Sequence, residues 1–138
     1  MSGRMDGHVA VVTGAGAKSG IGYATALRLA EEGALVTATD VALDPSFTEP
    51  QVDGRLRFAQ HDATDESAWQ SVLDDAKKAH GNATVLVNNA GIIKWNVPIL
   101  EMSVADFRRT VDVNVTSMFL GMKSVVPQMV EAGHGSII

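Results

Sequence analysis

Two short glycine-containing segments hold the residues of this chain that are best suited to chemistry. The first runs from Thr13 to Gly22, the second is Asn88-Asn89-Ala90-Gly91, and each follows an apolar run. A turn without side chains that opens a helix offers backbone N–H donors and the positive end of the helix dipole. Gly14, Gly20 and Gly22 suit such a turn. Together the two segments predict a site for a dinucleotide, whose pyrophosphate requires close approach of the backbone.

The spacing of the glycines disfavours two other phosphate-binding loops. The pattern Gly-x-Gly-x-x-Gly fails when it starts at Gly14, because Ser19 occupies the position of the third glycine. A Walker loop requires a glycine directly before its lysine, and here Ala17 precedes Lys18. Hydrolysis of a nucleoside triphosphate is therefore disfavoured. For the first segment taken alone, an ordinary glycine-rich turn remains an open alternative.

Asp40 ends a second apolar run and bears on the choice of dinucleotide. A carboxylate at this point accepts the ribose hydroxyls of the adenosine half and repels a 2′-phosphate. This favours NAD over NADP. Two observations weigh against it: an aspartate at a strand end is often only solvated, and Lys18 is a cation that can meet a phosphate.

The apolar pattern predicts the elements that must position these residues. Apolar runs at 8–13, 34–39, 56–60 and 84–87 predict buried strands, and apolar residues at helical spacing predict helices over 21–32, over 65–80 and from Ser103 onward. Gly121 in the last helix is expected to mark a close approach, and Pro127 a kink. The fold class is therefore α/β, a Rossmann-like doubly wound parallel sheet, with residues 1–138 forming one dinucleotide-binding portion.

Composition narrows the class of protein. The chain has 138 residues, 46% of them hydrophobic and 20% charged, which suits one globular domain. The net charge of -5 is spread along the chain without a basic cluster, so we expect no nucleic-acid partner. No apolar stretch is long enough to span a bilayer, and the lack of cysteine favours a reducing compartment, the cytoplasm. The four histidines lie far apart, and no metal site is predicted.

With these motifs in this order, the chain resembles the short-chain dehydrogenase/reductase family over essentially all of its residues. The segment from Thr13-Gly14 to Gly20-Ile21-Gly22 is similar to the family's Thr-Gly-x-x-x-Gly-x-Gly. Asn88-Asn89-Ala90-Gly91 resembles its second signature, Asp62-Ala63 its adenine-contacting pair, and Asn114 its helical asparagine.

The resemblance implies roles for these residues. Asp62 would bond the adenine amino group, and Ala63 would donate a backbone N–H to the adenine ring. Asn89, Ala90 and Gly91 would line the ribose and the approach to the pyrophosphate, with Gly20 and Ile21 at the phosphates. Asn114 would help to hold a water of the proton relay through its backbone carbonyl.

The family activity implied is NAD(P)-dependent hydride transfer between a small-molecule secondary alcohol and a ketone. The resemblance also implies a homodimer or homotetramer. The apolar row that continues at helical spacing beyond Asn114 fits either a subunit interface or the core, and both readings stay open. Its members are Val115, Met118, Phe119, Met122, Val126 and Met129.

The sequence departs from the family pattern in two places. Five residues rather than three separate Gly14 from Gly20, so the loop is expected to bulge. The family's serine and Tyr-x-x-x-Lys do not occur: the only tyrosine, Tyr23, is followed four residues later by Leu27, and Ser136 is expected to precede the last strand. We therefore expect a chain truncated after the fourth strand and the helices that follow it, able to bind a dinucleotide without turnover. A non-catalytic dinucleotide-binding or sensor protein remains the alternative.

Overall fold

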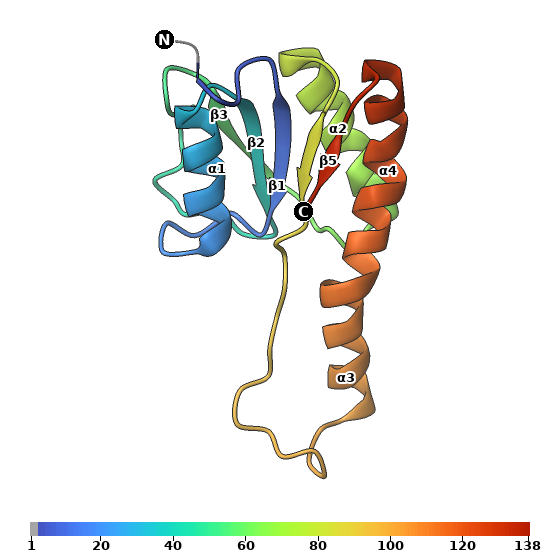
Figure 1. The fold of residues 1–138 in the computed structure, drawn as a ribbon. Coiled ribbons are helices and arrows are strands. Elements are labelled where there is room, and N and C mark those ends of the chain that lie inside the picture. The colour runs from blue at the N-terminus through green and yellow to red at the C-terminus, as the bar shows by residue number, and fades with distance from the viewer. Residues whose placement is uncertain (1–2) are drawn as a thin grey trace.

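A computed structural model of the chain describes residues 3–138. Five parallel strands form one sheet in the order β3-β2-β1-β4-β5, with α1 on one face and α2 and α4 on the other (Figure 1). The strands are β1 Val9–Thr13, β2 Leu35–Asp40, β3 Leu56–Gln60, β4 Val85–Val87 and β5 Ser136–Ile137. The helices are α1 Ile21–Glu31, α2 Glu66–His80, α3 Val104–Val111, the π-helix η1 Asp112–Thr116 and α4 Ser117–Ala132. The predicted doubly wound parallel sheet is confirmed.

Helix ends follow the capping signals of the sequence. The Asp65 side chain accepts the N–H groups of Ser67 and Ala68 at the start of α2, and Gly81, with φ 93°, ends that helix. Ser103 accepts the N–H of Asp106 at a distance of 3.0 Å and caps α3. A side-chain oxygen at this position satisfies an N–H that the helix itself leaves unpaired, which is why these two helices begin where they do.

Two apolar clusters hold the layers together. On one face of the sheet, small residues of α1 such as Ala26 and Ala30 pack on Val12 and Val36. On the other face, a second cluster with bulkier side chains joins the sheet to α2 and α4 through Val11, Trp69, Leu73, Leu86, Val125 and Met129. Both clusters flank β1, so the strand that leads into the glycine-rich turn is buried throughout.

Helix α4 approaches the sheet closely at Gly121, as the sequence predicts. A Cβ atom there would lie 2.8 Å from Oδ1 of Asn88 and 3.0 Å from the ring of Trp69. The apolar row after Asn114 divides between two environments: Met129 is buried, whereas Val115, Met118, Phe119, Met122 and Val126 are exposed. The core interpretation therefore holds for Met129 alone.

The two-residue strand β5 pairs Ser136 with Val85 and Ile137 with Leu86. Ser136 thus belongs to the strand rather than preceding it, and both residues of β5 are exposed rather than buried. Helix α3 and the segment that leads to it project away from the sheet (Figure 1). Over residues 3–138, no helix combines the length and apolar character needed to cross a membrane.

Candidate functional site

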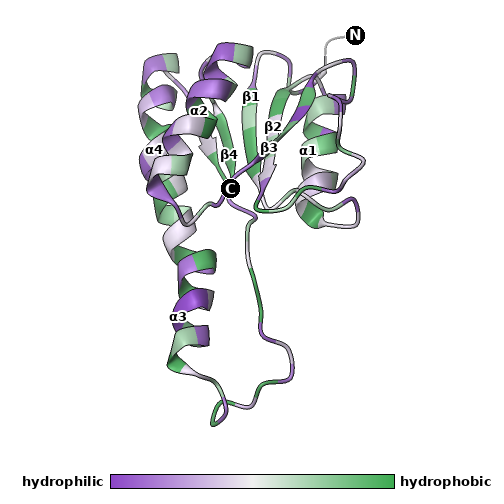
Figure 2. Cartoon of the chain, turned by 180° about the vertical axis from the view of Figure 1, so that it is seen from behind, coloured by the Kyte–Doolittle hydropathy of each residue, from purple (hydrophilic) through white to green (hydrophobic). Residues whose placement is uncertain are grey.

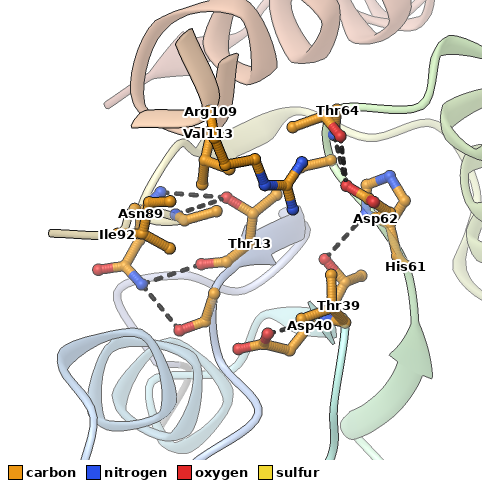
Figure 3. Close-up of a pocket in the computed structure, with 15 residues that line it drawn as sticks. Thr13, Thr39, Asp40, His61, Asp62, Thr64, Asn89, Ile92, Arg109 and Val113 are labelled. Atoms are coloured by element: carbon orange, nitrogen blue, oxygen red, sulfur yellow. Dashed lines mark hydrogen bonds between the residues drawn. The ribbon is translucent and has the colours of Figure 1, made fainter. Parts of the chain in front are cut away.

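The strongest candidate site is a pocket of about 210 Å³ at the carboxyl ends of β1 to β4 (Figure 3). It brings together seven of the residues singled out in the sequence. These are Gly14, Asp40, Asp62, Ala63, Asn89, Ala90 and Gly91. Four strands deliver them to one edge because every strand of the sheet runs in the same direction.

Thr13, the last residue of β1, connects the two signature segments. Its buried hydroxyl accepts the N–H groups of Asn89 and Ala90, at 3.1 and 3.0 Å, and donates to the carbonyl of Val87 at 3.3 Å. In the opposite direction, the Asn89 side-chain amide donates hydrogen bonds to the carbonyls of Thr13 and Gly14, at 3.0 and 2.9 Å. The Asn89 side chain therefore builds the pocket wall.

The glycines at 14 and 22 permit this close packing. A Cβ on Gly14, whose φ is 66°, would lie 2.7 Å from the Cα of Ala90. A Cβ on Gly22 would lie 2.4 Å from the Gly14 carbonyl oxygen and 2.5 Å from Nδ2 of Asn89. Any side chain at either position would separate the two signature segments, so Gly22 acts in packing and does not line the pocket.

Gly20 and Ile21 lie at the start of α1, outside the pocket lining. Gly20 is the N-cap residue with φ -87° and ψ 154°, and no side chain caps the first turn. Ile21 is 80% exposed. The first N–H groups of α1 are thus free of side-chain partners within the described residues, an arrangement that suits an anion.

Asp62 follows β3 and presents a charged acceptor to the pocket. One of its oxygens accepts the backbone N–H and the hydroxyl of Thr64, at 2.9 and 2.7 Å. These bonds, the hydroxyl first, hold the pKa of Asp62 below its usual range, with a smaller contribution from the positive charge of Arg109. The second oxygen accepts no hydrogen bond from residues 3–138 and can receive an amino group.

His61 lies beside Asp62 and is almost fully buried. Its Nδ1 is 3.1 Å from the hydroxyl of Thr39, and its ring stands edge to face with Trp69 at a centroid distance of 4.5 Å. Burial lowers the pKa of His61, although the nearby carboxylates of Asp62 and Asp65 oppose this shift. The ring is therefore neutral near pH 7.

Asn114 lies apart from the pocket lining, in the π-helix η1. Its side-chain oxygen accepts the N–H of Ile92 at 2.7 Å, and its amide donates to the Ile92 carbonyl at 2.8 Å. Asn114 thereby ties the chain beyond β4 to the helix α3-η1-α4. The role expected from the sequence concerns its backbone carbonyl, whereas these contacts are made by its side chain.

Sequence reasoning missed six lining residues: Thr39, Val41, His61, Thr64, Arg109 and Val113. Arg109 and Val113 are four residues apart, so the helix carries both side chains on one face, and both point into the pocket (Figure 3). In the sequence, a charged residue on a helix is typical of a solvated face. Only the placement of the C-terminal end of α3 beside the pocket shows that Arg109 belongs to the site.

Comparison with known proteins agrees with this geometry. A family model described as short chain dehydrogenase matches residues 8–138. The chain belongs to the short-chain dehydrogenase family. This short-chain dehydrogenase is 39% identical over 139 residues to a 3-alpha-(or 20-beta)-hydroxysteroid dehydrogenase of Mycobacterium bovis, covering 100% of this chain and 52% of that protein. It is 35% identical over 141 residues to an NADP-dependent (R)-specific alcohol dehydrogenase of Lentilactobacillus kefiri, covering 100% of this chain and 55% of that protein.

A crystal structure of a Burkholderia xenovorans protein assigned to the short-chain dehydrogenases/reductases superposes on the chain with a TM-score of 0.84 at 33% identity. The match covers 98% of this chain and 54% of that structure. The chain thus spans about half the length of the relatives it matches. Among residues 3–138 no group of three or more histidine, cysteine, aspartate or glutamate side chains is placed to hold a metal ion.

Proposed function

We propose that this short-chain dehydrogenase binds NAD in the pocket at the carboxyl edge of its sheet and serves the interconversion of a small secondary alcohol and a ketone. The observation that carries the proposal is the Asp40 carboxylate, which ends β2 and lines the pocket. A carboxylate at this position accepts ribose hydroxyls and repels a 2′-phosphate. In the same proposal, the free oxygen of Asp62 receives the adenine amino group and the N–H of Ala63 meets the adenine ring.

The glycine packing supports the same cofactor. The packing of Gly14 and Gly22 against the Asn89 segment holds the start of α1 beside the pocket, and the uncapped N–H groups there, at Gly20 and Ile21, offer donors to the pyrophosphate. Asn89, Ala90 and Gly91 would border the ribose from β4. The dinucleotide, when bound, supplies the hydride acceptor or donor.

Cofactor preference is tested by competing titrations, since one relative is named as NADP-dependent. Isothermal titration of the chain with NAD and with NADP should show NAD binding at least about tenfold more tightly, because the 2′-phosphate would face the charge of Asp40. Asp40→Asn removes that charge without changing the shape of the side chain and should reduce the ratio. NADP binding as tightly as NAD to the unmodified chain would overturn the role of Asp40.

Proton transfer is proposed to depend on residues outside positions 1–138. The single tyrosine, Tyr23, donates its hydroxyl to Gln51 at 3.0 Å and stacks on Phe47, away from the pocket lining. A general acid must reach the reacting oxygen, and Tyr23 does not. A polypeptide of residues 1–138 should therefore bind NAD yet form no NADH with a series of secondary alcohols. A sustained rate from a preparation of verified mass would contradict this.

Asn114 is proposed to contribute to the reaction as a positioning residue near the substrate side. The π-helix at Asp112–Thr116 changes the backbone hydrogen bonding there, and such local changes recur at functional sites. In the intact protein, Asn114→Ala should lower kcat with little effect on the Kd for NAD, because Asn114 is outside the cofactor pocket. An equal loss in kcat and in NAD affinity would indicate a purely structural role.

A homodimer or homotetramer is proposed from the exposed apolar side chains of α3, η1 and α4. Figure 2 shows hydrophobic segments along these helices. The exposed members include Phe107, Val111, Val115, Met118, Phe119, Met122 and Val126. A contiguous apolar surface of this kind is typical of a protein–protein interface.

A further inference from the structure

The lengthened loop between Gly14 and Gly20 does not simply bulge into solvent. Its first part is buried against the end of β2: Ala15 donates its N–H to the Thr39 carbonyl at 3.0 Å, and Gly16 donates its N–H to Oδ2 of Asp40 at 2.9 Å. The Gly16 carbonyl in turn accepts the N–H of Asp44 at 2.7 Å. Only the second part, Ala17 to Ser19, is exposed.

Gly16 fits this place because it lacks a side chain. A Cβ atom there would lie 2.0 Å from the carbonyl oxygen of Ala42 and 2.6 Å from the Cβ of Asp40. Both neighbours belong to the β2 end and its following turn, so they cannot both move without moving Asp40. The requirement for glycine is one of space, since the φ of Gly16 is not in the left-handed region.

We propose that Gly16 is a positioning residue for Asp40, and that the contact between the lengthened loop and the end of β2 sets the preference of this protein for NAD over NADP. The inference rests on the proposed NAD-binding function and adds to it a residue that touches the carboxylate rather than the cofactor. Its basis is the juxtaposition of the buried Gly16 N–H with the Asp40 carboxylate.

The two oxygens of Asp40 are held by two different segments. Oδ2 accepts the Gly16 N–H, and Oδ1 accepts the N–H of Val41 at 2.8 Å. An ionised carboxylate has about four acceptor positions, so each oxygen can still accept a ribose hydroxyl. Without the Gly16 bond, Asp40 would be held only by its own chain neighbour and could turn away from the ribose.

The test compares the ratio of the Kd values for NAD and NADP, measured by isothermal titration. Gly16→Ala should weaken NAD binding by about tenfold and leave NADP binding unchanged or tighter, because a misplaced carboxylate loses hydroxyl contacts and repels a 2′-phosphate less. Ser19→Ala, in the exposed part of the same loop, is the matched control and should leave the ratio as it is. In an Asp40→Asn background, Gly16→Ala should add no further change to the ratio.

Amide exchange gives a measurement that needs no change at Gly16. In Asp40→Ala, the Gly16 amide should exchange at least about tenfold faster, whereas the Ala15 amide, bonded to the Thr39 carbonyl, should keep its protection. This variant makes space in the loop contact and is expected to fold even where Gly16→Ala does not.

The outcomes separate the two proposals. If the unmodified chain binds neither dinucleotide, or prefers NADP, the proposed function fails. If the unmodified chain prefers NAD but a folded Gly16→Ala keeps that preference, or if the Gly16 amide stays protected in Asp40→Ala, then the positioning role alone is overturned.

Discussion

The Thr13 hydroxyl joins the two signature segments of the candidate site through three hydrogen bonds. Thr13→Val keeps the volume of the side chain but leaves the N–H groups of Asn89 and Ala90 without their acceptor. We expect a loss of about 1–3 kcal/mol in the free energy of unfolding, the usual cost of buried unpaired donors, measured by urea denaturation. Thr13→Ser retains the hydroxyl and should stay close to the unmodified chain. An unchanged urea midpoint for Thr13→Val would show that these bonds do not stabilise the site.

His61 makes stability depend on pH below neutrality. Burial lowers its pKa in the folded state, so the unfolded chain binds the proton more readily. The contribution of neutral His61 to the free energy of unfolding is therefore fully present above the ordinary histidine pKa, about 6.5, and is lost as the pH falls below that value. His80, whose pKa is also lowered by burial, acts in the same direction.

Thermal unfolding between about pH 7.5 and pH 5.5, where carboxylates stay ionised in both states, measures this dependence. We expect the melting temperature of the unmodified chain to fall with pH, and His61→Gln to fall less steeply. The exposed His134, replaced by glutamine, provides the control and should keep the full slope. Equal slopes for the chain and for His61→Gln would exclude His61 as the titrating group.

At the scale of elements, Gly121 sets the distance between α4 and the sheet. A methyl group at this position would press on Oδ1 of Asn88 and on the Trp69 ring, which is buried among residues of α2 and the sheet. Gly121→Ala should therefore lower the free energy of unfolding by about 1–3 kcal/mol in chemical denaturation, in spite of the better helix propensity of alanine. Val130→Ala, on the exposed side of the same helix, should change it by less than about 0.5 kcal/mol. A more stable Gly121→Ala would mean that α4 has room to move outward.

The elements that the sequence predicts well are those with strong local signals. Asp65 and Ser103 are capping residues that mark the starts of α2 and α3. The apolar runs predict the bounds of β1 to β4 to within a residue or two. The π-helix at Asp112–Thr116 leaves no such signal, because one extra residue in a turn barely changes the apolar spacing. Phe119 and Met129 show a second limit: both fit the same helical row, yet only the position of α4 on the sheet decides which one is buried.

The residues of the candidate site also fall into two groups, those that the sequence predicts and those that it does not. Glycines and carboxylates that follow strands, such as Gly14, Asp40 and Asp62, can be placed from the sequence because all parallel strands end at one edge. The burial of Gly16 against Asp40 depends on how a longer loop folds back, and the position of Arg109 depends on where α3 lies. Both are tertiary contacts between segments far apart in the chain, and neither has a local pattern.

At the scale of the whole molecule, the sheet and α1 form a well-packed body, whereas α3, η1 and α4 leave a row of apolar side chains uncovered. Phe119 is 57% exposed and Val115 58%, on adjacent turns of the continuous helix. Water contact with such a row is unfavourable, and a second copy with the same row would remove it from solvent through a two-fold contact.

Phe119→Glu tests this association, because a carboxylate at the centre of a self-complementary apolar face would be buried against its own copy. Sedimentation equilibrium of the intact protein, with whatever residues flank positions 1–138, should show a dimer or tetramer, and the variant should shift it toward the monomer. Lys123→Ala changes a side chain of the same helix that pairs with Glu66 of α2, so it should preserve the assembly. If the unmodified protein stays monomeric over the whole concentration range, the homo-oligomer is excluded. If Phe119→Glu and Lys123→Ala dissociate the assembly equally, the contact does not run through the apolar row.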